Sequence, residues 1–135
     1  MGTDHVIVES WANPVGYANG RIGIGRVLHI AGQIGWNAQC RFESEDFVAQ
    51  FTQALDNVIA VVHAARGRAT DIATMTIYVT DMDIYRTRRK ELGPIWKLRM
   101  QGHYPTMAVV GVTSLVERVA CVEISAVAYL EREDE

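Results

Sequence analysis

The stretch from residue 44 to residue 80 of this 135-residue chain constrains the fold most, because it joins an amphipathic helix directly to an alternating strand. Ser44 precedes two acidic residues, as the N-cap of a helix does, and Gly67 is placed to end that helix. In residues 74–80 apolar and polar side chains alternate strictly, so one face of this strand is apolar. The apolar residues of the helix recur every three or four positions: Phe47, Phe51, Leu55, Val58, Val62 and Ala65. We therefore expect the helix to pack on an apolar sheet face.

Strand and helix patterns also fill the rest of the chain. Residues 5–10 are expected to form a strand, and the glycine-punctuated residues 19–35 two strands, as a hairpin or a bulged pair. A second helix is expected over residues 83–100, with a kink or restart at Pro94, because proline lacks an amide hydrogen. Residues 106–112 and 119–130 are the last two strands.

The element order β-β-β-α-β-α-β-β predicts an α+β fold in which a mixed β-sheet carries two helices on one face. A single domain spanning residues 1–135 is expected for this length. No element is left to cover the second face of the sheet, which favours an oligomer. The threonine-rich side of residues 74–80 faces either water or a partner subunit.

Charge and composition argue against several classes of partner. The net charge of −3 gives no general attraction to nucleic acid or to anionic membranes. No apolar run approaches the roughly 20 residues of a membrane span, and the N-terminus lacks the pattern of a signal peptide. The four histidines and two cysteines show no metal-ligand spacing, so no metal site is expected. We expect a cytoplasmic protein without a membrane partner, for which nucleic acid is an unlikely partner.

One carboxylate and one histidine are candidates for chemistry. Strand parity places Glu123 with Cys121 and Ser125 on one face, opposite the apolar Ile124. That carboxylate lies either on an exposed face or in a cleft, where partial burial raises a carboxyl pKa and allows proton transfer near neutral pH. His103, just before a Tyr-Pro turn, is the histidine expected nearest to a site.

The second helix is basic. Tyr85 and Trp96 are spaced to lie on its buried side. Its cations are expected to form a solvated surface rather than a phosphate-binding face, since no aromatic ladder interleaves with them. These cations are Arg86, Arg88, Arg89, Lys90, Lys97 and Arg99.

Five segments of the chain, in order, resemble the RidA/YjgF family, also called the reactive intermediate deaminase (Rid) family. They are VGYANG, HIAGQIGWN, the long block from FTQALDNVIAVV to ATMTIYVTDM, HYPTMAVVGV and VEISAVAYL. The resemblance extends from about residue 17 to residue 130. The resemblance implies a chorismate-mutase-like fold and a homotrimer whose three sheets form a central barrel, with ligand clefts between subunits. Archetypal members hydrolyse 2-aminoacrylate and related enamines or imines to 2-oxo acids and ammonia, without a metal or organic cofactor.

The functional residues of the family match this sequence only in part. The tyrosine that closes the pocket falls on Tyr17, and the glutamate that positions or activates water falls on Glu123. The arginine that grips the substrate carboxylate is replaced by Met107. The other correspondences are Ala31 for a serine, followed by an unchanged Gly32 and Gln33, Val109 for a cysteine and Lys90 for an asparagine.

The loss of the arginine decides how much of the family's function is expected here. Methionine supplies apolar volume and no positive charge, so we expect little archetypal 2-aminoacrylate deaminase activity and a more apolar cleft, to which Trp96 also contributes. Lys90 or Arg118 would be the alternative source of a positive charge.

Three functions stay open. The first is a hydrolase or deaminase of a small enamine or imine metabolite other than 2-aminoacrylate. The second is a trimer that binds a small-molecule metabolite without chemistry, as a sensor or scavenger. The third is an endoribonuclease, as some family members have been described. The acidic composition and the lack of a recognisable His/Lys pair make it the weakest of the three.

Overall fold

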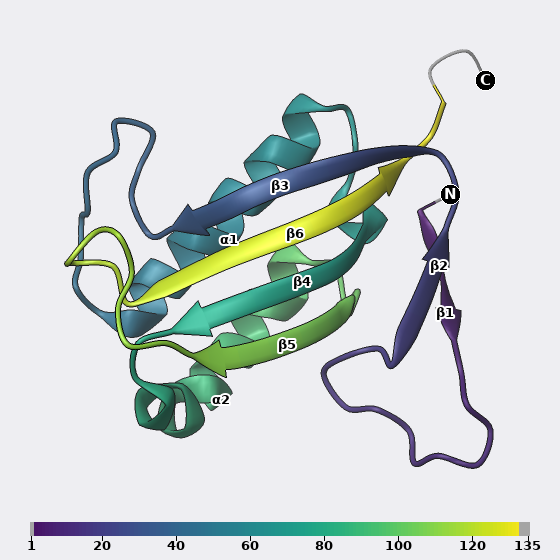
Figure 1. Cartoon of the computed structure of the whole chain (residues 1–135), viewed down its shortest axis with the longest axis horizontal. Coiled ribbons are helices and arrows are strands. Elements are labelled where there is room, and N and C mark those ends of the chain that lie inside the picture. The colour runs from purple at the N-terminus through teal and green to yellow at the C-terminus, as the bar shows by residue number, and fades with distance from the viewer. Residues whose placement is uncertain (1, 133–135) are drawn as a thin grey trace.

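A four-stranded mixed sheet in the order β3-β6-β4-β5 carries both long helices on one face (Figure 1). The computed structural model describes residues 2–132. β4 is antiparallel to β6 and parallel to β5, and β3 is antiparallel to β6. The predicted α+β fold, with a mixed sheet and two helices on one face, is confirmed. The bounds are β3 Arg26–Ile34, α1 Phe47–Ala64, the short 3-10 helix η1 Ala69–Asp71, β4 Ile72–Val79, α2 Met82–Arg99, β5 Thr106–Gly111 and β6 Val122–Leu130.

The first two strands form a small sheet of their own, beside the main one (Figure 1). β1 (Thr3–Val6) pairs antiparallel with β2 (Gly20–Gly23), so the first strand starts earlier than expected. The expected pairing within residues 19–35 is wrong, because β2 and β3 belong to different sheets. The chain crosses between them at Gly25, whose φ is +132° and where a Cβ would collide with the carbonyl oxygen of Leu130. This close approach to the end of β6 commits β3 to pairing with β6.

Both ends of α1 differ by one or two residues from the sequence expectation. Asp46 is the N-cap and accepts a hydrogen bond from the amide of Ala49 at 3.1 Å. Ser44 instead accepts from the Asp46 amide at 3.0 Å, and so orders the residue that caps the helix. At the other end Arg66, not Gly67, adopts a positive φ of 68°. The amide of Gly67 then donates a hydrogen bond to the last turn of α1, so Arg66 and Gly67 together end the helix.

The core lies between the helices and the inner face of the sheet. The expected apolar face of residues 74–80 is confirmed, since Met75, Ile77 and Val79 are each at most 2% exposed. The helix meets it with the residues predicted from their spacing, and β6 adds its alternate positions. Large, fully buried contributors include Phe51, Leu55, Val58, Met75, Ile124 and Met100.

The second helix continues through Pro94, so the expected restart there is not observed. Pro94 lies on the exposed side of α2, where the carbonyl one turn earlier belongs to the exposed Lys90 and is open to water. Leu92 and Trp96 are buried against the core. Within residues 2–132, neither α1 nor α2 combines the length and apolar character needed to cross a membrane.

A buried glutamine ties α1 to the start of β6. Gln50 is 1% exposed, and its amide nitrogen donates to the carbonyl oxygens of Ser44 and Val119 at 3.1 and 2.9 Å. Its oxygen accepts from the backbone amide of Cys121 at 2.9 Å. A Cβ at Gly35 would lie 2.6 Å from that of Gln50, so the chain after β3 passes close to the same point. This one side chain therefore fixes the positions of three segments that are distant in sequence.

Replacing Gln50 by leucine should lower the free energy of unfolding by about 3 kcal/mol. The leucine fills similar volume but leaves two carbonyl oxygens and one amide buried without partners. Urea denaturation followed by circular dichroism measures the change. Gln53→Leu is the matched control. Gln53 donates to the side-chain oxygen of Asn57 at 2.9 Å, and its replacement should cost less than about 1 kcal/mol. Equal effects of the two substitutions would contradict the role given to Gln50.

Candidate functional site

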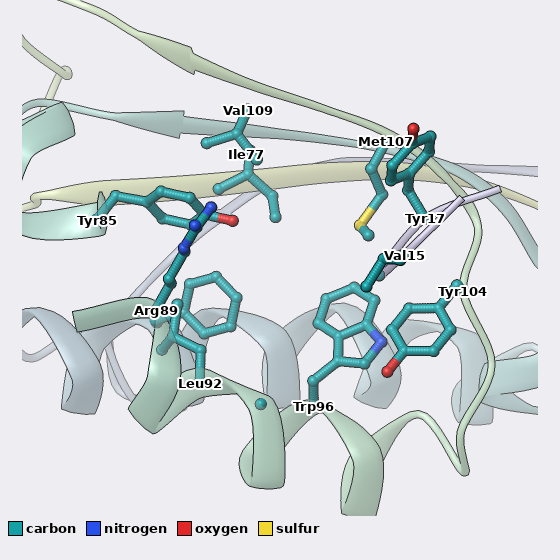
Figure 2. Close-up of a pocket in the computed structure, with 13 residues that line it drawn as sticks. Val15, Tyr17, Ile77, Tyr85, Arg89, Leu92, Trp96, Tyr104, Met107 and Val109 are labelled. Carbon is teal, nitrogen blue, oxygen red and sulfur yellow. The ribbon is translucent and has the colours of Figure 1, made fainter. Parts of the chain in front are cut away.

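A cavity of about 680 Å³ opens between α2, the inner face of β5 and the loop that precedes β2 (Figure 2). Each of these three segments supplies one wall, and Phe51 of α1 together with Ile77 of β4 closes the floor. Most of the lining side chains are apolar or aromatic. The site is therefore a largely apolar chamber, typical of small-molecule sites.

Strand register supplies the β5 wall. In the parallel ladder Met107 pairs with Met75, and Val109 pairs with Ile77. Paired residues point to the same side of a sheet, and Met75 and Ile77 face the helices. Met107 and Val109 therefore point toward α2 and line the cavity (Figure 2).

The loop before β2 brings Tyr17 to the same place. The Ala18 amide donates to the carbonyl oxygen of Pro105 at 3.1 Å, and Arg21 donates through Nε to the carbonyl oxygen of Tyr104 at 2.9 Å. These two bonds hold the loop against the start of β5. Tyr17, 44% exposed, lies beside Met107 at the mouth of the cavity (Figure 2).

The helix wall is a single stripe along α2. Tyr85, Arg89, Leu92 and Trp96 line the cavity at spacings of four, three and four residues, which is one face of a helix. Trp96 stacks on Tyr104 with ring centroids 6.2 Å apart and planes 9° apart. Its indole nitrogen donates to the backbone carbonyl of the residue before Tyr104, so the aromatic end of the cavity is held rigidly.

Polar groups from α2 gather at the other end of the cavity. Tyr85 and Arg89 lie there together (Figure 2). Burial raises the pKa of the Tyr85 hydroxyl, and the positive charge of Arg89 opposes part of that rise. Arg89 is exposed, as expected for the solvated basic surface, and it also lines the cavity, for which the sequence analysis had looked to Lys90 or Arg118 as the cation. The three- and four-residue spacing that placed Tyr85 and Trp96 on the buried side also includes Arg89, and this was the signal that could have found it.

Glu123 lies on the other face of the sheet. It pairs with Tyr78, and its neighbour Ser125 pairs with Thr76, on the side that turns away from the helices. Within one chain the sheet therefore separates Glu123 from the cavity lined by Met107.

A bulge between β3 and β6 gathers several of the remaining candidates beside Glu123. The register of the two strands shifts between Ile30 and Gln33. A Cβ at Gly32 would collide with the Glu123 carboxylate, so only glycine lets that group lie against the β3 backbone. Gly32 thus lies against Glu123, Ala31 and Gln33 flank it on β3, and none of the three is among the cavity-lining residues. Lys90 is exposed on α2 and is not among the cavity-lining residues.

His103 contacts the backbone rather than the cavity. Its Nε2 lies 2.7 Å from the carbonyl oxygen of Ile72, at the start of β4. Burial lowers the pKa of His103, and the positive charge of Arg21 adds to this effect, while the Ile72 carbonyl opposes it. His103 was expected near a site, but its neighbour Tyr104 lines the cavity and His103 does not. The imidazole instead joins the turn to β4.

Most arginines of α2 are paired with acids, as expected for a solvated helix surface. Arg88 contacts Glu91 at 2.6 Å and Asp46 at 2.8 Å, and Arg99 contacts Asp56 at 2.7 Å. Within residues 2–132, no group of three or more His, Cys, Asp or Glu side chains is arranged to hold a metal ion.

The sheet with both helices on one face, together with a cavity that opens along its edge strand β5, is the architecture of the chorismate-mutase-like α+β fold. A family model described as Endoribonuclease L-PSP matches residues 10–130. The chain therefore belongs to the RidA/YjgF family, as its sequence segments predicted.

Relatives agree with this assignment. A RutC family protein of Haemophilus influenzae is 30% identical over 107 residues, which are 79% of this chain and 82% of that protein. A 2-iminobutanoate/2-iminopropanoate deaminase of Dermatophagoides farinae is 24% identical over 87% of this chain and 89% of its own length. Among solved structures, the Rid-family protein YyfB of Yersinia pestis, described as of unknown function, superposes with a TM-score of 0.83. It is 27% identical, and the match covers 96% of this chain and all of that one.

The buried imidazole predicts a pH dependence of stability. Because the pKa of folded His103 lies below its ordinary value of 6.5, the unfolded chain binds a proton that the folded chain resists. This contribution to stability is present above about pH 6.5 and is lost as the pH falls toward the lowered pKa. Urea denaturation between pH 5 and 8 should therefore show a shallower acid loss of stability for His103→Gln than for the wild type. His63→Gln, at an exposed position of α1, should keep the wild-type slope, and a wild-type slope in His103→Gln would assign the effect to another group.

Proposed function

We propose that this protein is a hydrolase that releases ammonia from a small imine or enamine other than 2-aminoacrylate, without a metal or organic cofactor. The observation that carries the proposal is the cavity in which Tyr17, Met107 and Val109 meet. These are three of the positions at which the family places its substrate. The name of the Dermatophagoides farinae relative, an iminobutanoate and iminopropanoate deaminase, supports the reaction class.

Met107 argues against the smallest 2-imino acids as substrates. Short 2-imino acids carry their carboxylate next to the reacting carbon, so binding them requires a cation close to the β5 wall. Met107 and Val109 offer only apolar surface there. A carboxylate placed against them would lose its hydration without gaining a partner, which is strongly unfavourable. The cavity of about 680 Å³ instead suits a substrate with a larger apolar part.

Glu123 supplies the proton transfers in this proposal. A water molecule attacks the carbon of the protonated imine, and the carboxylate takes up one proton from that water, which gives a carbinolamine. The carboxyl group returns this proton to the nitrogen, the carbon–nitrogen bond breaks and ammonia leaves, and the carboxylate takes the hydroxyl proton as the carbonyl product forms. The sheet separates Glu123 from the cavity of its own chain, so the site is completed by a second copy.

A homotrimer meets this requirement. The outer face of the sheet carries Thr76, Tyr78 and Glu123, all only partly exposed, and neither α1 nor α2 covers it (Figure 1). Packing three such faces into a central barrel, as the family resemblance implies, buries this surface. Glu123 of the partner subunit would then lie at the cavity edge of its neighbour.

The separation of Glu123 from the cavity also favours a second function. If no copy brings that carboxylate to the ligand, the cavity binds a small metabolite without chemistry, as a sensor or scavenger. The two functions differ in turnover and not in binding, so an ammonia-release assay separates them.

Glu123→Gln should lower ammonia release by at least about 100-fold on any imine that the wild type turns over, because the amide cannot accept the proton. The assay is ammonia release from a panel of amino-acid-derived imines generated by an amino acid oxidase. Glu45→Gln, at an exposed position before α1, is the matched control and should retain wild-type rates. Full activity in Glu123→Gln would remove the proposed mechanism, and no turnover on the whole panel by the wild type would favour the binding protein.

Met107→Arg should give the protein activity on 2-aminoacrylate, by at least about tenfold over the wild type, because a guanidinium can hold the substrate carboxylate in a bidentate pair. The substrate is formed in the assay from serine by a dehydratase, and ammonia beyond the uncatalysed background is measured. Met107→Gln, of similar size and uncharged, is the control and should gain nothing. No gain in Met107→Arg would show that the missing charge is not the main barrier to 2-aminoacrylate.

A further inference from the structure

One cation lies in the apolar stripe of α2. Tyr85, Leu92 and Trp96 face the sheet, and Arg89 lies among them on the same helical face. A position with this spacing usually carries an apolar side chain that packs on the core. In Figure 2 the guanidinium of Arg89 extends from α2 toward the ring of Tyr85, along the cavity wall. This arginine therefore contributes charge to the cavity instead of apolar packing.

Arg89 differs from the other arginines of α2 in its partners. Arg86, Arg88 and Arg99 each contact a carboxylate at 3.0 Å or less. For Arg89, no carboxylate of residues 2–132 lies within ion-pair distance. Its described neighbour is the Tyr85 hydroxyl, which is uncharged at neutral pH, since burial raises its pKa further above the ordinary value of 10. The positive charge of Arg89 is thus available to an anion that enters the cavity.

The other end of the cavity is apolar and aromatic. Arg89 and Trp96 are seven residues apart on one helix, which is about 10 Å along its axis. Leu92 lies between them on the helix, and Ile77 faces it from the sheet (Figure 2). A ligand that spans the cavity therefore meets a positive end, an apolar middle and an aromatic end.

We propose that Arg89 is the anion anchor of this cavity, and that it binds the carboxylate of a ligand whose apolar body extends along α2 toward Trp96. Carboxylate recognition then comes from the helix wall, whereas Met107 on the strand wall contacts the apolar body. The Tyr85 hydroxyl donates a second hydrogen bond to the same carboxylate. This inference rests on the proposed function only in taking the cavity as the ligand site, and it defines the ligand class: a carboxylate about 10 Å from the far end of its apolar body.

A carboxylate fits this anchor better than a phosphate does. One guanidinium and one phenol hydroxyl can satisfy two oxygens that lie in a plane. A phosphate monoester presents three oxygens and a charge near −2. The neighbouring cation Lys90 is outside the cavity lining and cannot serve the third oxygen there.

The test uses a matched pair of probes and isothermal titration calorimetry on the full-length protein. The probes are 4-phenylbutanoate and its neutral isostere 4-phenylbutanamide. Arg89→Gln should weaken binding of the carboxylate by about 10- to 100-fold, the range for losing a hydrogen-bonded charged partner, and leave the amide within about twofold. Arg89→Lys should fall between the wild type and Arg89→Gln, because lysine retains the charge but not the paired donors.

Arg86→Gln is the matched control. Arg86 lies on the same helix, is exposed and undergoes the same loss of one positive charge, but it does not line the cavity. Binding of both probes should be unchanged in this variant. Unchanged binding of the amide by Arg89→Gln also shows that the cavity of that variant is intact.

Three results would overturn the proposal. The wild type binds neither probe, or it binds the amide as tightly as the carboxylate, or Arg86→Gln weakens the carboxylate as much as Arg89→Gln does. Failure of the anchor and failure of the hydrolase are distinguishable. Arg89-dependent carboxylate binding by a protein that turns over no imine retains the anchor and removes the hydrolase. Imine turnover and carboxylate binding that are both unchanged in Arg89→Gln would retain the hydrolase and remove the anchor.

Discussion

The pairing of β4 with two strands of opposite direction determines the rest of this structure. Ile77 pairs with Val109 on one side and with Ile124 on the other. Because paired residues share a face, this one register assigns Val109 and Met107 to the helix side and Glu123 to the outer side. A shift of the register by one residue would exchange the two faces and bury the threonines of β4 instead. Such a shift would be costly, because it would turn the apolar face that α1 covers away from the helix. The same register therefore builds the core and places Met107 and Glu123 on opposite faces of the sheet.

That division gives the two faces of the sheet different roles. The inner face, with α2 above it, forms a chamber with largely apolar and aromatic walls, to which Arg89 adds a positive charge. The outer face holds a carboxylate that lies against the backbone of Gly32. A ligand bound in the chamber cannot reach this carboxylate through a packed sheet. The proposed chemistry at Glu123 therefore requires a second copy of the chain, whereas the proposed binding along α2 does not.

The redistribution of charge around the chamber defines how this protein differs from the archetype of its family. Met107 removes a cation from the strand wall, and Arg89 supplies one on the helix wall. The two positions lie on different elements, so the exchange changes where a carboxylate binds relative to the β5 wall. In our proposal this exchange changes the length and shape of the ligand that fits, while the fold stays that of the family. The proposed ligand class thus depends on a few side chains and not on the fold.

The sequence by itself determined the element order, the apolar face of α1 and the parity of β4 and β6, because each depends on spacing within one element. It also placed Glu123 on the face opposite Ile124. The partner of β2 could not be predicted, because it depends on the close approach of Gly25 to Leu130. The pairing of β5 with β4, and hence the side to which Met107 points, is a contact between distant segments. Arg89 was visible in the helical spacing, but only the tertiary structure showed that this exposed side chain also lines a cavity.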